Sequence, residues 1–295
     1  MSNTRKLLYW ITGFYVVGIV LLVIIFGFGH KNNTFQIQNE FKLDNWVSLG
    51  VFSINRAVVY LFLAAIATIV TMIWIADRMQ QRPNKVQTAV EALFSLMRDN
   101  VTRGNLDDSM AAKWFPFLGA LFLFIWFSNL IGYIPLPTNS QETFNLFGVH
   151  IPDFALYAAT ANISVPLALA LVVFIIFNWT GIRAQGLIGY VKSLIPSGVH
   201  GPMLLLIAPL EIISTFMRLI SLTIRLFANI LAGHLIILFM SGGLAVILGL
   251  SFLGWFTLPI GIAVYLFELG LVATLQAFIF ATLAAIYIGG SVTHH

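Results

Sequence analysis

The last third of the chain carries four charged side chains in an otherwise apolar stretch, residues 201–290, and chemistry is expected at these positions. They are Glu211, Arg218, Arg225 and Glu268. An arginine in the middle of a membrane helix costs roughly 2.5–3.5 kcal/mol on insertion scales, so it needs a partner, a water-filled cavity or a function. Arg225 has about twenty apolar-rich residues on each side, too many for its head group to reach the interface. We therefore expect Arg225 to carry the chemistry.

Arg225 belongs to a polar stripe along one face of its predicted helix. At 100° per residue, the residues at offsets of −14, −7, −4 and +4 from it fall within a narrow arc. These residues are Glu211, Arg218, Ser221 and Asn229. Two interpretations stay open. The stripe moves charge together with a partner, or Arg225 only pairs with Glu211 or Glu268 and holds two helices together.

A second group of polar residues includes His234. This histidine follows Arg225 by nine residues, which places it on roughly the opposite side of the helix and about 13 Å further along its axis. Glu268 and Gln276 lie on the next predicted helix, so a histidine–carboxylate pair is available. Histidine ordinarily titrates near pH 6.5, which suits a proton relay. The alternative is that His234 is a packed residue without a role in transfer.

The composition predicts an integral membrane protein. Of the 295 residues, 59% are hydrophobic and only 9% are charged, whereas soluble domains have about 25% charged residues. The net charge of +4 is scattered between apolar runs and forms no nucleic-acid-binding stripe. There is no cysteine, and no metalloprotease, hydrolase or nucleotide-binding motif. We expect no cofactor and no metal site.

The apolar runs predict an all-α protein with about six transmembrane helices, the last two long and tilted. The runs are 7–29, 57–76, 114–135, 155–182 and two within 201–290, with a turn near 241–243. We interpret residues 1–30 as a membrane anchor, the alternative being a cleaved signal peptide. Residues 31–295 then form the main membrane domain.

One further helix is predicted to lie in the membrane interface. Apolar residues recur there at helical spacing, with charged residues between them. They are Val86, Val90, Leu93, Met97 and Val101. The alternative is a helix that docks a soluble partner.

The distribution of basic residues predicts the topology. Ten lysines and arginines lie in 5–6, 78–113 and 183–192, and three lie elsewhere outside the last two spans, at 31, 42 and 56. This bias predicts that both termini and the two basic loops are cytoplasmic.

Three stretches of the chain closely resemble the a subunit of F-type ATP synthases. They are 209–211 (PLE), 220–234 (ISLTIRLFANILAGH) and 275–283 (LQAFIFATL). The resemblance covers about residues 45–290 and includes the break at 129–135 (NLIGYIP). The chain is therefore identified as a member of this family of proton-conducting stator subunits.

The resemblance implies a role for each polar residue. The essential arginine of the family corresponds to Arg225, its neighbouring amide to Asn229, the glutamine of the last helix to Gln276 and the cytoplasmic-side carboxylate to Glu211. His234 takes a position in the outer half-channel, while Ser221 lies on the same stripe as Arg225. Protons would enter one water-filled half-channel, bind a carboxylate on a ring of c subunits, and leave through the other half-channel. Arg225 would favour the ionised carboxylate and block a direct short circuit.

The resemblance also implies partners and a location. The partners would be the c-subunit ring, the peripheral-stalk b subunits, other ATP synthase subunits and the lipid bilayer. Nucleic acid would not be a partner. The location would be an energy-coupling membrane, either the bacterial plasma membrane or the mitochondrial inner membrane. The chain itself would not be an enzyme but a subunit that binds no nucleotide.

Three departures from the family pattern are visible. The ionisable partner on the last helix usually lies seven residues before the glutamine, but Glu268 lies eight before Gln276, which requires a local bulge or a shifted pairing. Two acids found in some members are replaced by Gly132 and Thr160. The anchor at 7–29 is additional to the five-span members.

Two other classes of protein remain possible on the sequence alone. A secondary transporter or ion channel with an intramembrane ion pair would need a self-contained pore and usually has an internal repeat. We find no repeat in the sequence. A purely structural assembly subunit would not need Arg225.

Overall fold

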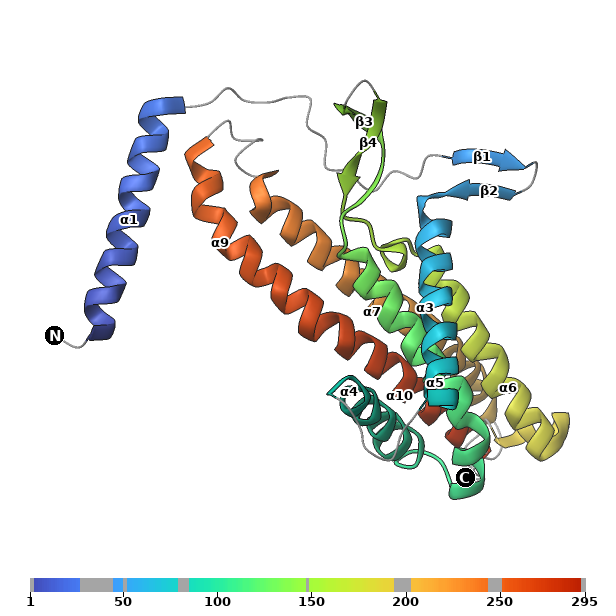
Figure 1. The fold of residues 1–295 in the computed structure, drawn as a ribbon. Helices are drawn as coiled ribbons and strands as arrows, with labels where there is room; N and C mark the ends of the chain where they lie inside the picture. Colours follow the sequence, from blue (N-terminus) through green and yellow to red (C-terminus); the bar gives the residue numbers. More distant parts are fainter. Residues whose placement is uncertain are drawn as a thin grey trace. The chain divides into compact units, whose positions relative to one another are not determined.

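A computed structural model describes residues 3–26, 45–49, 52–78, 85–146, 149–193, 203–243 and 251–292. Helices dominate it, as the sequence predicts (Figure 1). The α-helices are α1 (Asn3–Phe26), α3 (Arg56–Arg78), α4 (Lys85–Ser95), α5 (Asp108–Gly132), α6 (Ser164–Ser193), α7 (Met203–Leu238), α9 (Ser251–Phe267) and α10 (Ala273–Gly290). The expected all-α membrane class is confirmed.

Shorter elements connect these helices. Three π-helical segments are η1 (Leu96–Thr102), η3 (Phe239–Gly243) and η4 (Glu268–Val272), and η2 (Ala159–Ala161) is a 3₁₀ turn. Two antiparallel hairpins, which the sequence analysis did not predict, occupy polar loops. They are β1 (Asn45–Leu49) with β2 (Phe52–Asn55), and β3 (Leu136–Leu146) with β4 (Val149–Ala155).

Five stretches of the described residues are long and apolar enough to cross a membrane. They are Arg56–Ile75, Asp108–Gly132, Ser164–Ser193, Leu206–Ser241 and Leu253–Gly290. The helix expected at 7–29 forms as α1 but is not among these five, so its role as an anchor stays a prediction. The last two stretches have 36 and 38 residues. At 1.5 Å per residue they are about 54 and 57 Å long, and must tilt in a hydrocarbon layer of about 30 Å.

The fourth span begins later than predicted. We expected it at 155–182, but β4 continues to Ala155, η2 follows, and α6 starts only at Ser164. The Asn162 side chain accepts a hydrogen bond of 3.1 Å from the Ser164 backbone N–H. Pro166 then lies in the first turn, where its missing N–H leaves no helix bond unmade. The apolar run alone does not show where the helix starts, because residues before Ser164 are also apolar.

Two other boundaries differ from the prediction. α5 starts at Asp108, before the expected start at 114, and α6 continues to Ser193, beyond the expected end at 182. The helix of the third span ends at Gly132, inside the 129–135 break. Residues 241–243, where we expected a turn, belong to η3, the π-helical extension of α7. Residues 244–250, before α9, lie outside the described part.

The chain forms two compact units. One contains residues 44–135, 157–231 and 271–295, and the other contains 1–43, 136–156 and 232–270. We call them the larger and the smaller unit. In the larger unit, α5 packs against α3 and α10, and α10 also packs against α6. The β1–β2 hairpin lies at one end of α3 (Figure 1). The core of these helices is built largely from small residues of α10 and large ones of α5, such as Ala277, Ala281, Leu118 and Phe122. Such close backbone approach is typical of membrane helix packing.

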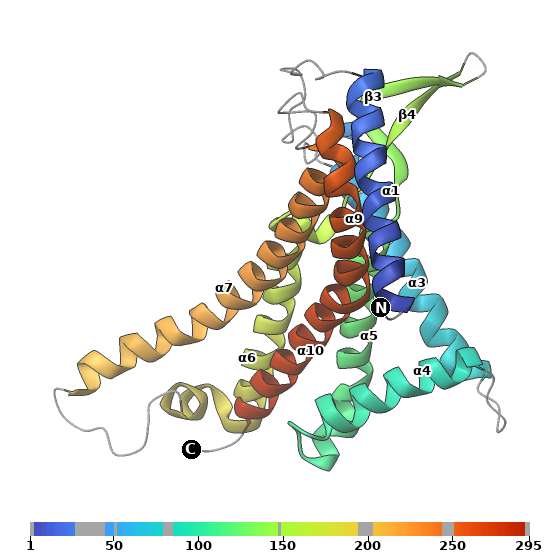
Figure 2. The same ribbon diagram turned by 90° about the vertical axis from the view of Figure 1, so that its left-hand side faces the viewer.

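The predicted interfacial helix also forms. α4 and η1 lie across the ends of α3 and α5 rather than alongside them (Figure 2). Met97 and Val101 are buried, whereas Arg98 and Asp99 are exposed. The apolar side of this helix therefore faces the ends of the spans, and its charged side faces away from them.

The predicted topology can be tested with single cysteines, because the chain has none of its own. We expect a membrane-impermeant maleimide to label Ser53→Cys in β2 and Asn139→Cys in β3 only from outside. Ser95→Cys in α4 should be labelled only from the cytoplasm, since the basic loops are retained there. Labelling of the β3 and α4 positions from the same side would contradict this topology.

Candidate functional site

The polar stripe on α7 is present, but not all its predicted members share one environment. Ser221, Arg225 and Asn229 are exposed, as their four-residue spacing requires. Glu211 and Arg218 are half-buried. The exposed polar stripe therefore consists of Ser221, Arg225 and Asn229.

Arg218 is oriented by an aromatic ring. Its guanidinium carbon lies 5.5 Å from the centroid of the Tyr287 ring on α10, within the range of a cation–π contact. Phe216, two residues earlier, stacks on Phe174 of α6 with ring centroids 5.4 Å apart. These contacts hold one side of α7 against α6 and α10 within the larger unit.

The side of α7 opposite the polar stripe is packed into the core. Leu222, Leu226 and Ile230 are at most 2% exposed and belong to the same buried cluster as Ala277 and Phe280 of α10. Burial of these residues fixes the rotation of α7 about its axis. The same rotation leaves Arg225 pointing out of the larger unit.

Arg225 therefore presents a permanent charge on an apolar surface. Exposed neighbours on α7 include Met217, Ile220 and Ile224. Within the described residues, Arg225 makes no ion pair. A guanidinium in such a position is stable in a membrane only when water or an anionic group of another molecule reaches it.

Gln276 lies on α10, close to two hydrogen bonds that attach this helix to α5. The Gln276 side chain is buried. The Trp126 indole N–H donates to the Thr274 hydroxyl at 3.0 Å, and the Asn129 amide donates to the Ala273 backbone carbonyl at 3.3 Å. These two bonds fix the start of α10, and with it the direction in which Gln276 leaves the helix.

Asn129 is also the centre of a small buried network. Its side chain is fully buried, and its carbonyl oxygen accepts a hydrogen bond of 2.8 Å from the Thr160 hydroxyl. Gly132, one turn later, is needed because a Cβ there would lie 2.6 Å from the Cβ of Ala158. The sequence identified Asn129 only as part of a helix break. An amide followed by glycine in an apolar helix is the signal that points to such a contact.

His234 and Glu268 both belong to the smaller unit and are both buried, with 4% and 8% of their surface exposed. The Glu268 carboxyl group lies against the backbone of Gly233, the residue before His234. A Cβ on Gly233 would be 2.9 Å from one carboxylate oxygen and closer still to the other. The structure thus brings Glu268 to the segment that carries His234, and a proton relay between the two residues stays a prediction.

The bulge required by the spacing of Glu268 and Gln276 is also found. Glu268 begins η4, a single π-helical turn between α9 and α10. A π-turn accommodates one extra residue in an α-helix and is frequent at functional sites. An eight-residue separation that includes this turn therefore has the helical phase of the seven-residue separation in the family pattern.

Gly233 provides a direct test of this close approach. Gly233→Ala should impair the function of His234 and Glu268, because the added methyl group overlaps the carboxylate and overpacking typically costs 1–3 kcal/mol. Adding Glu268→Asp, which shortens the side chain, should recover part of the loss. We would measure the amount of folded chain in membranes and proton transport in vesicles. Gly270→Ala is the control, since a Cβ there meets nothing within 4 Å; equal behaviour of the two alanine variants would contradict the proposed contact.

A buried cation that the sequence analysis used only as a topology marker lies at the start of α3. Arg56 is 3% exposed, and its guanidinium carbon lies 4.4 Å from the centroid of the Tyr157 ring. Tyr60 meets the same ring edge-on, with centroids 5.7 Å apart. Burial raises the pKa of the Tyr157 hydroxyl above its ordinary value. The positive charge of Arg56 lowers this pKa, but its effect is smaller than that of burial. An arginine four residues before a tyrosine at the start of a span is the only sequence signal for this cluster.

No group of three or more histidine, cysteine or acidic side chains suited to a metal occurs in the part of the chain that the structure describes.

Comparison with known proteins gives a consistent result. The family model described as the ATP synthase A chain matches residues 58–289. An ATP synthase subunit a from Rubrobacter xylanophilus is 36% identical over 80% of this chain and 83% of its own. One from Myxococcus xanthus is 35% identical over 82% of this chain and 75% of its own.

A third relative, ATP synthase subunit a of Anaeromyxobacter dehalogenans strain 2CP-C, is 32% identical over 82% of this chain. The match covers 58% of that relative, and 50% of the counterpart in strain 2CP-1. The chain thus spans little more than half the length of these two proteins.

Proposed function

The chain belongs to the ATP synthase A chain family, and from this premise we propose that it is the proton-translocating stator subunit of a rotary ATP synthase. In this role it exchanges protons between two half-channels and carboxylates on a ring of c subunits, and so couples proton flow to ATP synthesis. It is a multi-pass integral membrane protein. The membrane we propose is a bacterial plasma membrane.

The observation that carries the proposal is the outward-facing guanidinium of Arg225. It lies in a membrane span, it is exposed on α7, and its position follows from the packing of Leu222, Leu226 and Ile230. A cation at this depth needs a partner from another molecule. A carboxylate that is carried past on a rotating ring meets that need only while it is ionised.

The steps follow from charge and burial. A carboxylate beside Arg225 is stabilised without its proton, because an opposite charge at short range favours the ionised form. The same group must be protonated when it faces lipid, since an isolated charge is costly there. A proton gradient or membrane potential, worth about 2.3 kcal/mol per charge per 100 mV, then drives rotation in one direction.

The other polar residues serve the two half-channels in this proposal. Glu211 exchanges protons on the cytoplasmic side. His234 and Glu268 pass protons on the outer side, where their burial beside Gly233 shields the transfer from bulk water. Ser221, Asn229 and Gln276 offer hydrogen bonds to the ring carboxylate or to water near Arg225. Nucleotide chemistry takes place on other subunits.

Co-purification is the most direct test. A tagged version of the chain, extracted gently from membranes, should bring with it a ring-forming proteolipid with one membrane carboxylate, the peripheral-stalk b subunits and the ATP-hydrolysing subunits. Vesicles containing this complex should pump protons when ATP is added. A chain that purifies alone and still transports an ion would instead support the transporter or channel alternative.

A further inference from the structure

We propose that the chain binds one anionic phospholipid between α3, α4 and α5, with an acyl chain in an apolar cavity and the phosphate beside Arg98 and Arg103. All the residues concerned belong to the larger unit. The site is separate from the polar stripe and from His234 and Glu268, and its occupation does not depend on the function proposed above.

The apolar part of the site is a cavity of about 380 Å³. It is closed on three sides by α3, α4 with η1, and α5. Its lining includes Met72, Leu93, Met97, Phe115, Phe122 and Trp126. Cavities of about 300–1,000 Å³ with such a lining are typical of small-molecule sites. In a membrane, the apolar chains available to fill it are those of the lipids.

Gly119 of α5 opens the cavity. A Cβ built on this residue meets nothing within 4 Å, although the residue lies between the aromatic side chains that line the cavity. We therefore expect a larger side chain at Gly119 to extend into the cavity and to fill part of its space.

A hollow of about 130 Å³ adjoins the cavity. Its lining is largely apolar but includes Arg98, Thr102, Arg103 and Asp108. The two spaces share Phe94 and Phe115, whose rings meet edge to face with centroids 4.9 Å apart. An aromatic pair that separates an apolar cavity from a basic hollow matches the boundary between the acyl chains and the head group of a lipid.

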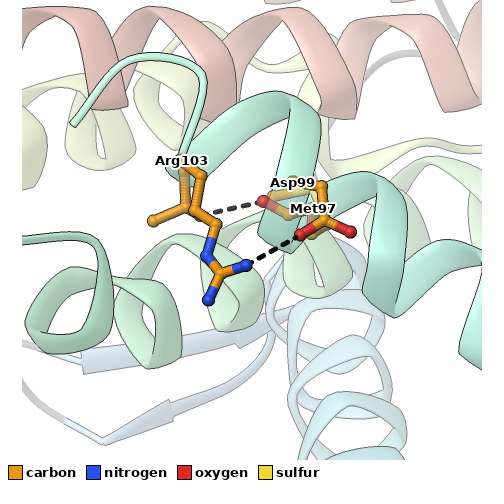
Figure 3. A network of polar contacts seen from close by, with 4 residues as sticks. Met97, Asp99 and Arg103 are labelled. Atoms are coloured by element: carbon orange, nitrogen blue, oxygen red, sulfur yellow. Dashed lines mark hydrogen bonds and ion pairs between the residues drawn. The ribbon is translucent and has the colours of Figure 1, made fainter. Parts of the chain in front are cut away.

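Two guanidinium groups at the hollow can bind an anion. They belong to Arg98 and Arg103, and the Asp108 carboxylate lines the same hollow. Asp99 forms an ion pair of 3.6 Å with Arg103, but both side chains are about half exposed (Figure 3). Such an exposed pair is weak. Arginine offers five N–H donors, so Arg103 can bind a phosphate while it keeps its contact with Asp99.

The depth of the site also agrees with a lipid. α4 and η1 lie across the ends of the spans α3 and α5 (Figures 1 and 2). An amphipathic helix of this kind lies at the boundary between head groups and acyl chains. The basic hollow on η1 is therefore at the level of the lipid phosphates. The apolar cavity continues from it toward the spans.

The test uses the full chain, purified with its bound partners and placed in vesicles of phosphatidylcholine with added phosphatidylglycerol that carries a photoreactive diazirine in one acyl chain. We expect light to attach this lipid to residues 85–127. Gly119→Leu should reduce the labelling to background. Gly13→Leu is the control, because a Cβ at Gly13 also meets nothing within 4 Å.

Head-group recognition is tested with the two arginines. Arg98→Gln and Arg103→Gln should each lower labelling by phosphatidylglycerol about fivefold, but not labelling by a photoreactive phosphatidylcholine. Arg183→Gln, which removes an exposed arginine of α6, should change neither. Equal labelling of Gly119→Leu and the wild type would overturn the proposal. So would efficient cross-linking of Gly119→Cys to another subunit, which would show that a protein segment fills the cavity.

Discussion

Replacing Arg225 with alanine is expected to abolish ATP-driven proton pumping and ATP synthesis. The guanidinium is exposed on α7 and belongs to no ion pair within the described residues, so its removal leaves the chain's own packing intact. In the proposed mechanism, the stabilisation of an ionised ring carboxylate is lost with it. A loss of 2.7 kcal/mol, within the range of charge costs in membranes, already corresponds to about a hundredfold. Passive proton leakage should increase at the same time, because no fixed charge separates the half-channels.

Lysine should be a poor substitute for Arg225. A guanidinium keeps its proton even when it is partly desolvated, whereas a buried ammonium can lose its proton and with it the charge. The planar guanidinium can also bind a carboxylate through two parallel hydrogen bonds, and an ammonium cannot form this arrangement. We expect Arg225→Lys to retain only a small part of the coupled transport.

Both variants are measured in inverted membrane vesicles with a pH-sensitive dye, and subunit content is compared with the wild type. Arg183→Ala, at an exposed arginine of α6, is the control for loss of a positive charge. A different result is expected if Arg225 has only a structural role. If Arg225 only balances Glu211 or Glu268, replacing arginine and acid together should restore much of the transport. Normal coupling in a fully assembled Arg225→Ala complex would refute the mechanism.

The arrangement around Arg225 could largely be predicted from the sequence, because it depends on local periodicity. A helix of 3.6 residues per turn places Ser221, Arg225 and Asn229 on one side, and the leucines between them must face the core. The structure places these three residues on one exposed side and removes Glu211 and Arg218 from the exposed stripe. The position of Arg218 depends on Tyr287, which lies on a different helix. No local pattern reveals that contact.

Contacts between distant segments could not be predicted in the same way. The approach of Glu268 to Gly233 joins residues thirty-five positions apart, and the absence of a side chain on Gly233 acquires meaning only when its neighbour is known. The π-turn η4 is an intermediate case. The spacing of Glu268 and Gln276 indicated that a bulge could be present, but it did not indicate at which residue the bulge lies. The hydropathy pattern did not indicate the two hairpins or the burial of Arg56. Hydropathy identifies apolar helices, not the polar contacts between them.

The second large effect is expected at Glu268. Replacement with glutamine keeps the size of the side chain, so the group still fits beside Gly233, but it removes the ability to take up and release a proton. If Glu268 and His234 form the outer relay, Glu268→Gln should slow ATP-driven pumping by about a hundredfold, the lower range for loss of a proton-transferring group. It should also flatten the pH dependence of pumping, because one of the two titrating groups is lost.

An exchange of the two side chains separates a relay from a structural contact. In His234→Glu combined with Glu268→His, both ionisable groups remain at buried positions of the smaller unit, although each occupies the other's place. A relay requires the pair rather than the order, so the double variant should pump better than either single variant, and its pH dependence should return. A purely structural carboxylate would give the opposite ranking, since Glu268→Gln would pump normally and the exchange, which puts an imidazole against Gly233, would be the most impaired of all.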